Sequence, residues 1–171
     1  MDGARIFNAI VHKKEAPAAY GKVFDSISIC LSKGLGAPVG SVLVSSKAFI
    51  KKARRWRKVF GGGMRQAGFL AAAGIYALDH NIERITIDHE KALLLKDALV
   101  HKEFVKEVLA VETNIVIAIL HGKYTPTSLV SKLAENGILA YAMSPTQIRF
   151  VLHLDITEEQ LAKTIETINK L

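Results

Sequence analysis

Alternating hydrophobic and polar residues predict that the first part of the chain contains both strands and helices. In the segment 25–33, the isoleucines and Leu31 point to one side of an extended chain, and the serines and Cys30 point to the other. This alternation predicts a strand that ends at Lys33, and a second strand follows over residues 39–45. Helical spacing predicts further elements: a short helix near 4–12, a loop up to residue 25, a basic helix over 47–58 and an Ala-rich helix over 67–77.

The second half of the chain is predicted to form a smaller α+β domain, an open-faced sandwich of strands covered by helices. A continuous apolar run at 114–120 is typical of a buried strand, and two further strands are predicted within 138–143 and 147–154. The composition becomes more charged near residues 81–89, so we place the boundary between residues 1–86 and 87–171. Three helices are predicted here: 90–102, 126–136 with a C-cap at Gly137, and one that Thr157 opens with the capping-box pattern Thr-Glu-Glu-Gln.

The composition is that of a folded protein with a sizeable core. Hydrophobic residues make up 50% of the 171 positions, and the mean hydropathy is +0.22. No apolar run approaches the roughly 20 residues of a membrane span, and no secretory signal pattern is present. The single cysteine, Cys30, has no internal disulfide partner. We therefore expect a cytoplasmic protein without a membrane partner and without a metal site.

The net charge of +7 comes from one predicted helix. Residues 47–58 contain seven lysines and arginines and no acid; removing them from the 23 basic residues leaves 16, equal to the 16 acidic residues. This basic helix has three interpretations: a solvated face, a surface for an anionic ligand or a subunit contact, or a nucleic-acid site. We expect no nucleic-acid partner. Its apolar stripe consists of Phe49, Ala53, Trp56 and Phe60.

Lys33 stands between a strand and a glycine-rich turn, and its amine is a candidate reactive group. Burial at the end of an apolar strand disfavours a charged ammonium, and the neutral amine is the nucleophile that covalent carbonyl chemistry requires. Small residues around the amine leave room for a flat ligand. An ordinary solvated turn is the alternative interpretation of this stretch taken by itself.

Four motifs in one chain carry a resemblance to a known family. They are MDGARIFNA (1–9), LSKGLGAPVGS (31–41), RRWRKVFGGGMRQAG (54–68) and IRFVLHLD (148–155). Together, in this order, they resemble the low-specificity L-threonine aldolases, which are pyridoxal-phosphate enzymes of the aspartate-aminotransferase-like fold. The resemblance covers essentially the whole chain. It implies an α/β fold: residues 1–86 as the C-terminal part of a fold-type-I transferase-like large domain that binds the cofactor, and residues 87–171 as a small α+β C-terminal domain.

The resemblance also implies roles for residues around the cofactor, pyridoxal 5′-phosphate. Lys33, in the motif Ser-Lys-Gly, corresponds to the catalytic lysine that bonds covalently to the cofactor, and Ser32 beside it is a cofactor-binding residue. Asp2 corresponds to the aspartate that pairs with the pyridine nitrogen. Arg5 corresponds to an arginine near the same face of the cofactor. Taken alone, Asp2 could equally be a solvated terminal residue.

Three further cations are assigned by the same resemblance. Lys58 and Arg65 are expected to bind the phosphate anion, from the same or a neighbouring subunit. Arg149 is expected to bind the α-carboxylate of the substrate. The residues alone leave alternatives, because Arg65 could cap a helix and Arg149 could be a charge at a strand edge. Two histidines receive no catalytic role: His153 is interpreted as structural and His89 as a surface residue.

The implied activity is the cleavage of L-threonine or L-allo-threonine to glycine and acetaldehyde by retro-aldol chemistry, in threonine catabolism and glycine biosynthesis. The Asp-Gly-Ala-Arg motif lies near mid-chain in the family, whereas here it begins at Asp2. We therefore expect a truncated or fragmentary copy that is inactive by itself, and a homodimer or homotetramer for the complete enzyme. The alternatives are a related β-eliminating lyase of aromatic amino acids, or a non-catalytic fragment or basic binding module.

Overall fold

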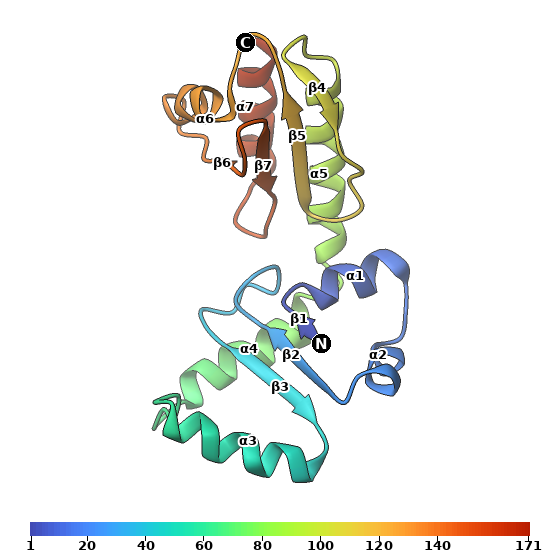
Figure 1. Ribbon diagram of the computed structural model, residues 1–171, viewed down its shortest axis with the longest axis vertical. Helices are drawn as coiled ribbons and strands as arrows, with labels where there is room; N and C mark the ends of the chain where they lie inside the picture. The colour runs from blue at the N-terminus through green and yellow to red at the C-terminus, as the bar shows by residue number, and fades with distance from the viewer. The chain divides into compact units, whose positions relative to one another are not determined.

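The computed structural model describes all residues from Met1 to Leu171, and they divide into two compact units (Figure 1). The first unit comprises residues Met1–Ile85 and the second comprises Thr86–Leu171. Each unit has its own sheet.

The first unit is built on a three-stranded sheet in the order β1-β2-β3. Strand β1 (Asp2–Gly3) runs parallel to β2 (Ser26–Cys30), and β3 (Ser41–Ser45) pairs antiparallel with β2 along its whole length. The predicted strand at Lys33 is shorter than expected. It ends at Cys30, because the Leu31 carbonyl accepts the Ala37 amide and the chain turns back on itself.

Four helices complete the first unit, and one of them contradicts the prediction. Residues expected to be a loop form a short helix, α2, in which Pro17 takes the first position and fixes the backbone angle that a helix requires. Helix α2 has no buried residue, so the apolar periodicity that reveals most helices is missing. Strand β1 was also missed, because it has only two residues. The helices are α1 (Ile6–Lys13), α2 (Pro17–Val23), α3 (Lys47–Val59) and α4 (Gly68–His80).

The core of the first unit lies on the apolar side of β2. Ile27 packs with Ile6 and Ile10 of α1, and Leu31 packs with Ala77 of α4. Figure 1 shows α4 passing behind the sheet, which agrees with the second of these contacts. The other buried apolar residues of this unit are Leu35, Ala37 and Ile85.

The second unit contains a four-stranded antiparallel sheet in the order β4-β5-β7-β6. Strand β4 was not predicted, because its sequence Val-Lys-Glu-Val has apolar residues only at its ends. The helix predicted from residue 90 starts earlier, at Ile85, because Asp88 and His89, which were assigned to the boundary, belong to its first two turns. The elements are β4 (Val105–Val108), β5 (Ile115–Leu120), β6 (Tyr141–Ala142), β7 (Gln147–Val151), α5 (Ile85–Val100), α6 (Pro126–Ala134) and α7 (Glu158–Asn169).

The ends of the helices in the second unit follow their local sequence. The capping box predicted at Thr157 is confirmed: its hydroxyl accepts the Gln160 amide, and the Gln160 side chain accepts the Thr157 amide. Helix α6 ends as expected near Gly137, which has a φ of 75°, and the next amide, that of Ile138, donates to the Leu133 carbonyl.

One hydrophobic cluster holds the second unit together. It contains fifteen buried apolar residues, which come from all three helices, from strands β5 and β7 and from the segments next to them. Leu99, Val116, Leu133 and Ile148 have no exposed surface. The buried positions alternate along β5, so one face of the sheet packs on α5 and α7 (Figure 1). None of the chain's helices combines the length and the apolar composition that crossing a membrane requires.

Candidate active site

Lys33 lies on a tight turn just beyond the end of β2. The Gly36 amide donates to the Lys33 carbonyl at 2.9 Å, and Gly36 has a φ of 72°, a backbone angle that favours glycine. The expectation that Lys33 is buried is wrong, since its side chain is exposed. The strand ends three residues earlier than predicted, so the lysine belongs to the turn and reaches solvent. No ion pair or hydrogen bond engages the amine, which leaves it open to a ligand.

Asp2 lies on the strand next to the one that leads to Lys33. It is in register with Ser28 of β2, so the two side chains share one face of the sheet. One carboxylate oxygen accepts the Ala4 amide at 3.0 Å, and the side chain is exposed and has no ion-pair partner. Because β1 and β2 are parallel, their carboxyl ends meet at one edge of the sheet, where α/β proteins commonly bind ligands.

The thiol of Cys30 provides a link between this face and Lys33. Burial raises the pKa of the Cys30 thiol, but hydrogen bonds from Ser32 and Ser41 and the nearby positive charge of Lys33 together lower it below its usual value. The Cys30 sulfur lies 3.5 Å from the Ser32 hydroxyl oxygen. The amine of Lys33 and the hydroxyl of Ser32 therefore lie near the polar face of β2.

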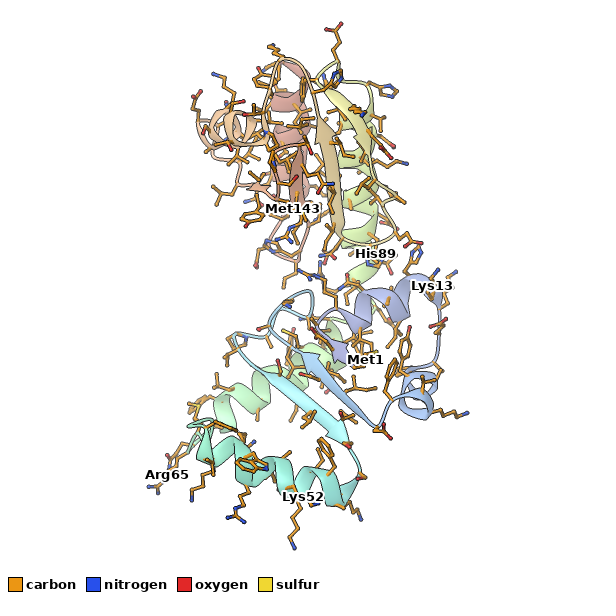
Figure 2. The ribbon with its side chains drawn as sticks, viewed as in Figure 1. Met1, Lys13, Lys52, Arg65, His89 and Met143 are labelled. Carbon is orange, nitrogen blue, oxygen red and sulfur yellow. The ribbon has the colours of Figure 1, made fainter.

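Arg5, Lys58 and Arg65 are exposed cations at other positions of the first unit. Arg5 precedes α1 and makes no capping hydrogen bond with its side chain. Lys58 lies in the last turn of α3, and Figure 2 shows Arg65 on the loop that follows this helix. No hydrogen bond or ion pair joins any of these three cations to Asp2 or Lys33, so their shared role at a phosphate stays a prediction.

The glycine-rich loop after α3 packs closely on the end of that helix. The Gly62 amide donates to the Arg57 carbonyl at 2.7 Å. A Cβ atom on Gly62 would lie only 3.0 Å from the Cγ atom of Arg57 and 3.2 Å from its carbonyl oxygen. A larger residue here would force Arg57 to shift, so the close approach favours glycine at this position.

Helix α3 is basic as predicted, and its apolar stripe is uncovered. Ser46 caps the helix by accepting the Phe49 amide. Trp56 and Phe60 stack with ring centroids 5.8 Å apart, yet both side chains are exposed. A groove of about 480 Å³ lies between α3 and the strands β2 and β3, lined among others by Leu43, Ile50, Arg54 and Arg57. Both the charges and the apolar side chains of this helix therefore remain available for contacts.

Arg149 belongs to the second unit and is a cation without an anion. On β7 it is in register with Ile117 of β5 and Tyr141 of β6, on the face opposite the buried Ile148 and Phe150. Its guanidinium carbon lies 5.3 Å from the centroid of the Tyr141 ring. The buried Nε atom has no hydrogen-bond partner, and no carboxylate pairs with the side chain. Such a half-buried, unpaired guanidinium suits a ligand carboxylate.

Several other residues differ from the sequence expectations. His89 was expected at the surface and is buried, 8% exposed. His153 lies beyond the end of β7, with its Nδ1 atom 3.4 Å from a carboxylate oxygen of Asp155. Two asparagines beside the Lys33 turn, Asn8 and Asn81, were not singled out. Asn8 lies inside the first family-like motif, and this position was the only signal for it. No sequence pattern points to Asn81.

Comparison with known proteins identifies related sequences. Residues 1–123 match the model of the beta-eliminating lyase family. The chain is 45% identical over 170 residues to the low specificity L-threonine aldolase of Escherichia coli K12, covering 95% of this chain and 47% of that protein. It is 43% identical over 168 residues to low-specificity L-threonine aldolase 1 of Arabidopsis thaliana, covering 96% of this chain and 47% of that protein. The chain thus spans about half the length of the curated relatives it matches.

Solved structures show the same fold. The threonine aldolase of Leishmania major superposes with a TM-score of 0.75 at 17% identity, covering 99% of this chain and 50% of that one. At this identity the likeness concerns the fold alone. It confirms the predicted α/β class as part of a fold-type-I transferase-like structure.

Proposed function

Because this chain belongs to the beta-eliminating lyase family, we propose that it forms part of a pyridoxal-phosphate-dependent threonine aldolase. The proposed reaction cleaves L-threonine or L-allo-threonine to glycine and acetaldehyde. The observation that carries the proposal is Lys33, an unpaired amine on a tight turn at the end of β2, beside the strand of Asp2. The 45% identity to a threonine aldolase supports this choice of reaction.

The donor set of the first unit fits pyridoxal phosphate in its chemistry. Lys33 offers an amine to hold the aldehyde carbon, and Asp2 offers a carboxylate to the ring nitrogen. When bound, the cofactor supplies an electron sink for the negative charge left at the substrate α-carbon. Three cations without ion-pair partners could serve the phosphate, and a hydroxyl lies next to the lysine: Arg5, Lys58, Arg65 and Ser32.

The environment of Asp2 suits its proposed role. One carboxylate oxygen accepts the Ala4 amide, which fixes the side chain beside the backbone of its own turn. The other oxygen has no partner and can accept a hydrogen bond from a protonated ring nitrogen. A charge-assisted bond of this kind keeps the proton on the ring, which is the form in which the ring withdraws electrons best.

Arg149 is proposed to bind the α-carboxylate of the substrate. A guanidinium presents paired N–H donors that match the two oxygens of a carboxylate, and the Nε atom of Arg149 has no partner within the protein. The Tyr141 ring lies against the guanidinium and limits its movement. By fixing the carboxylate, Arg149 would hold the breaking Cα–Cβ bond in the orientation that the reaction needs.

The proposed reaction is that of the complete enzyme. This chain spans about half the length of its threonine aldolase relatives. The chain alone is expected to bind the cofactor weakly and to lack useful activity. The complete enzyme is proposed to be a cytoplasmic homodimer or homotetramer that acts in threonine catabolism and glycine formation. The exposed cations and aromatic rings of α3 support a subunit contact there.

A chimera tests the reaction. The matching half of the E. coli threonine aldolase is replaced by this chain, and the purified protein is given threonine with pyridoxal phosphate. Release of acetaldehyde supports the proposal, provided that the same chimera with Lys33→Ala releases none. Pyruvate from tyrosine or tryptophan without acetaldehyde from threonine would favour the β-eliminating alternative. A folded chimera that forms neither product contradicts both.

The isolated chain provides a second test. Rapid cleavage of threonine by the purified 171-residue protein would contradict the view that it holds only part of the active site.

A further inference from the structure

We propose that Asn81 is a positioning residue for Lys33, because its side-chain amide holds the turn that carries the lysine in one conformation. The inference rests on the proposed function, in which Lys33 bonds covalently to the cofactor. It adds a residue that lies outside the four family-like motifs.

The turn is closed by its own backbone, except at one carbonyl group. The Gly36 amide donates to the Lys33 carbonyl at 2.9 Å, and the Ala37 amide donates to the Leu31 carbonyl at 3.0 Å. The carbonyl of Leu35, at the far side of the turn, receives no backbone donor. The Leu35 side chain is 2% exposed, so this peptide is anchored in the interior. A carbonyl in such a place costs free energy unless a side chain or water donates to it.

Asn81 supplies the missing donor from a distant part of the sequence. Its Nδ2 atom lies 2.7 Å from the Leu35 carbonyl oxygen, although the two residues are 46 positions apart. Asn81 caps the end of α4, and its own backbone amide donates to the Ala77 carbonyl. Ala77 and Leu35 belong to one buried cluster. The hydrogen bond therefore ties the turn to a helix end that is itself fixed by packing.

Asn8 of α1 limits movement of the turn on a second side. A Cβ atom at Gly34 would lie 3.1 Å from the Nδ2 atom of Asn8, so the Gly34 backbone packs directly against this carboxamide. Asn8 is 4% exposed and belongs to a helix whose apolar side is buried. The residue after Lys33 is thus confined by Asn8, and the following residue is held by Asn81.

The consequence is a fixed backbone beneath a flexible side chain. Lys33 can change its side-chain torsions, but its Cα atom can move only if the Asn81 hydrogen bond breaks or the packing against Asn8 is lost. A reactive amine gains from such a support, because small displacements of a reacting group cost large factors in rate. Asn81 acts through the turn and touches no reacting atom.

The test compares two asparagines that make the same kind of bond. Asn81→Leu removes the donor while keeping a similar volume and no charge. The matched control is Asn136→Leu at the end of α6, where the Asn136 amide donates to the Lys132 carbonyl at 3.1 Å. Asn81→Gln keeps a carboxamide and is expected to retain part of the effect. Each variant of the 171-residue chain is incubated with pyridoxal phosphate, reduced with borohydride and mapped by peptide mass spectrometry.

The expected result is a loss of selectivity at Lys33. The wild-type chain and Asn136→Leu label Lys33 in preference to the other lysines, and Asn81→Leu lowers this preference about 5- to 10-fold, the factor that a net hydrogen bond supports. Exchange of the Gly36 and Ala37 amides, followed by NMR or mass spectrometry, should accelerate by a similar factor in Asn81→Leu only. Unchanged labelling preference together with unchanged amide exchange in Asn81→Leu overturns the proposal.

The two readouts separate this inference from the proposed function. If the wild-type chain shows no preference for Lys33, the covalent role of Lys33 loses the support of this experiment and depends on the chimera, while amide exchange still shows whether Asn81 holds the turn. Should Asn81→Leu fail to fold, Asn81→Ser gives the same comparison with Asn136→Ser, because a serine hydroxyl is too short to replace the carboxamide.

Discussion

The two units differ in how well each buries its own apolar surface. The second unit has one continuous cluster of fifteen buried apolar residues, whereas the first has clusters of five and three. The central strand β5 of the second unit buries every second side chain completely or nearly so. In the first unit, the three apolar residues of β3 are 40–48% exposed, and Phe69 on α4 is 91% exposed.

The larger core and most of the candidate cofactor residues lie in different units of this chain. Asp2, Lys33 and the cationic helix lie on the unit with the smaller core, and that unit exposes an edge strand and several aromatic rings. Large exposed apolar surfaces are typical of interfaces. Arg149 lies on the self-contained unit and can keep its geometry there. We therefore expect changes to the second unit to appear first in stability, and changes to the first unit to appear first in ligand chemistry.

The largest expected effect comes from separating the units. Residues 86–171 alone should unfold cooperatively and bind little hydrophobic dye, because their core is the larger one, whereas residues 1–85 alone should be less stable and bind more of the dye. Near-ultraviolet circular dichroism, dye binding and thermal unfolding of the two polypeptides measure this. If residues 1–85 alone unfold cooperatively and bind no dye, the small clusters are enough to hold this unit together, and the proposed difference between the two cores is wrong.

A smaller effect is expected from equal truncations placed in the two units. Leu133→Ala removes a fully buried side chain and should lower the free energy of unfolding by about 2–5 kcal/mol. Leu43→Ala removes a side chain that is 40% exposed and should cost under about 1 kcal/mol. Urea unfolding of residues 86–171 measures the first change. Fluorescence of Trp56, the one tryptophan, follows the second in the whole chain. Equal losses would contradict the difference between the cores.

Arg149→Met tests whether the unpaired cation serves folding or a ligand. Its Nε atom is buried without a partner, so an apolar side chain of similar length should leave stability unchanged or raise it by up to about 1 kcal/mol. The loss of the contact with the Tyr141 ring limits the gain. Urea unfolding of residues 86–171 provides the measurement. A loss above roughly 1 kcal/mol would identify Arg149 as a structural residue.

The smallest expected effect concerns the thiol of Cys30. Burial raises its pKa, and the hydrogen bonds of Ser32 and Ser41 and the charge of Lys33 lower it further than burial raises it. Lys33→Ala removes one lowering cause, so the pKa of the thiol should rise and less thiolate should be present at a given neutral pH. Alkylation by iodoacetamide should therefore slow, with the rate-against-pH curve shifted to higher pH. The control is Lys52→Ala on α3, a charge that has no part in this shift. Superimposed curves for wild type and Lys33→Ala would contradict the closeness of Lys33 to the thiol.

The local sequence predicted those elements whose stability depends on nearby residues. The capping box at Thr157, the basic helix α3 and the apolar strand β5 all appear where the pattern placed them. The elements that were missed have weak local signals. Helix α2 buries nothing, and the interior of β4 is charged, so neither shows the periodicity that burial imposes on a sequence.

The sequence by itself determined the family and the identity of the candidate residues, because motif chemistry is written in residue types and in their order. Only the tertiary structure decided their surroundings. It placed Lys33 on an exposed turn instead of a buried strand end, put His89 in the interior, and brought Asn81 to the Leu35 carbonyl across 46 positions. The physical reason is that exposure and long-range hydrogen bonds depend on which distant segments pack together, and local periodicity carries no information about that.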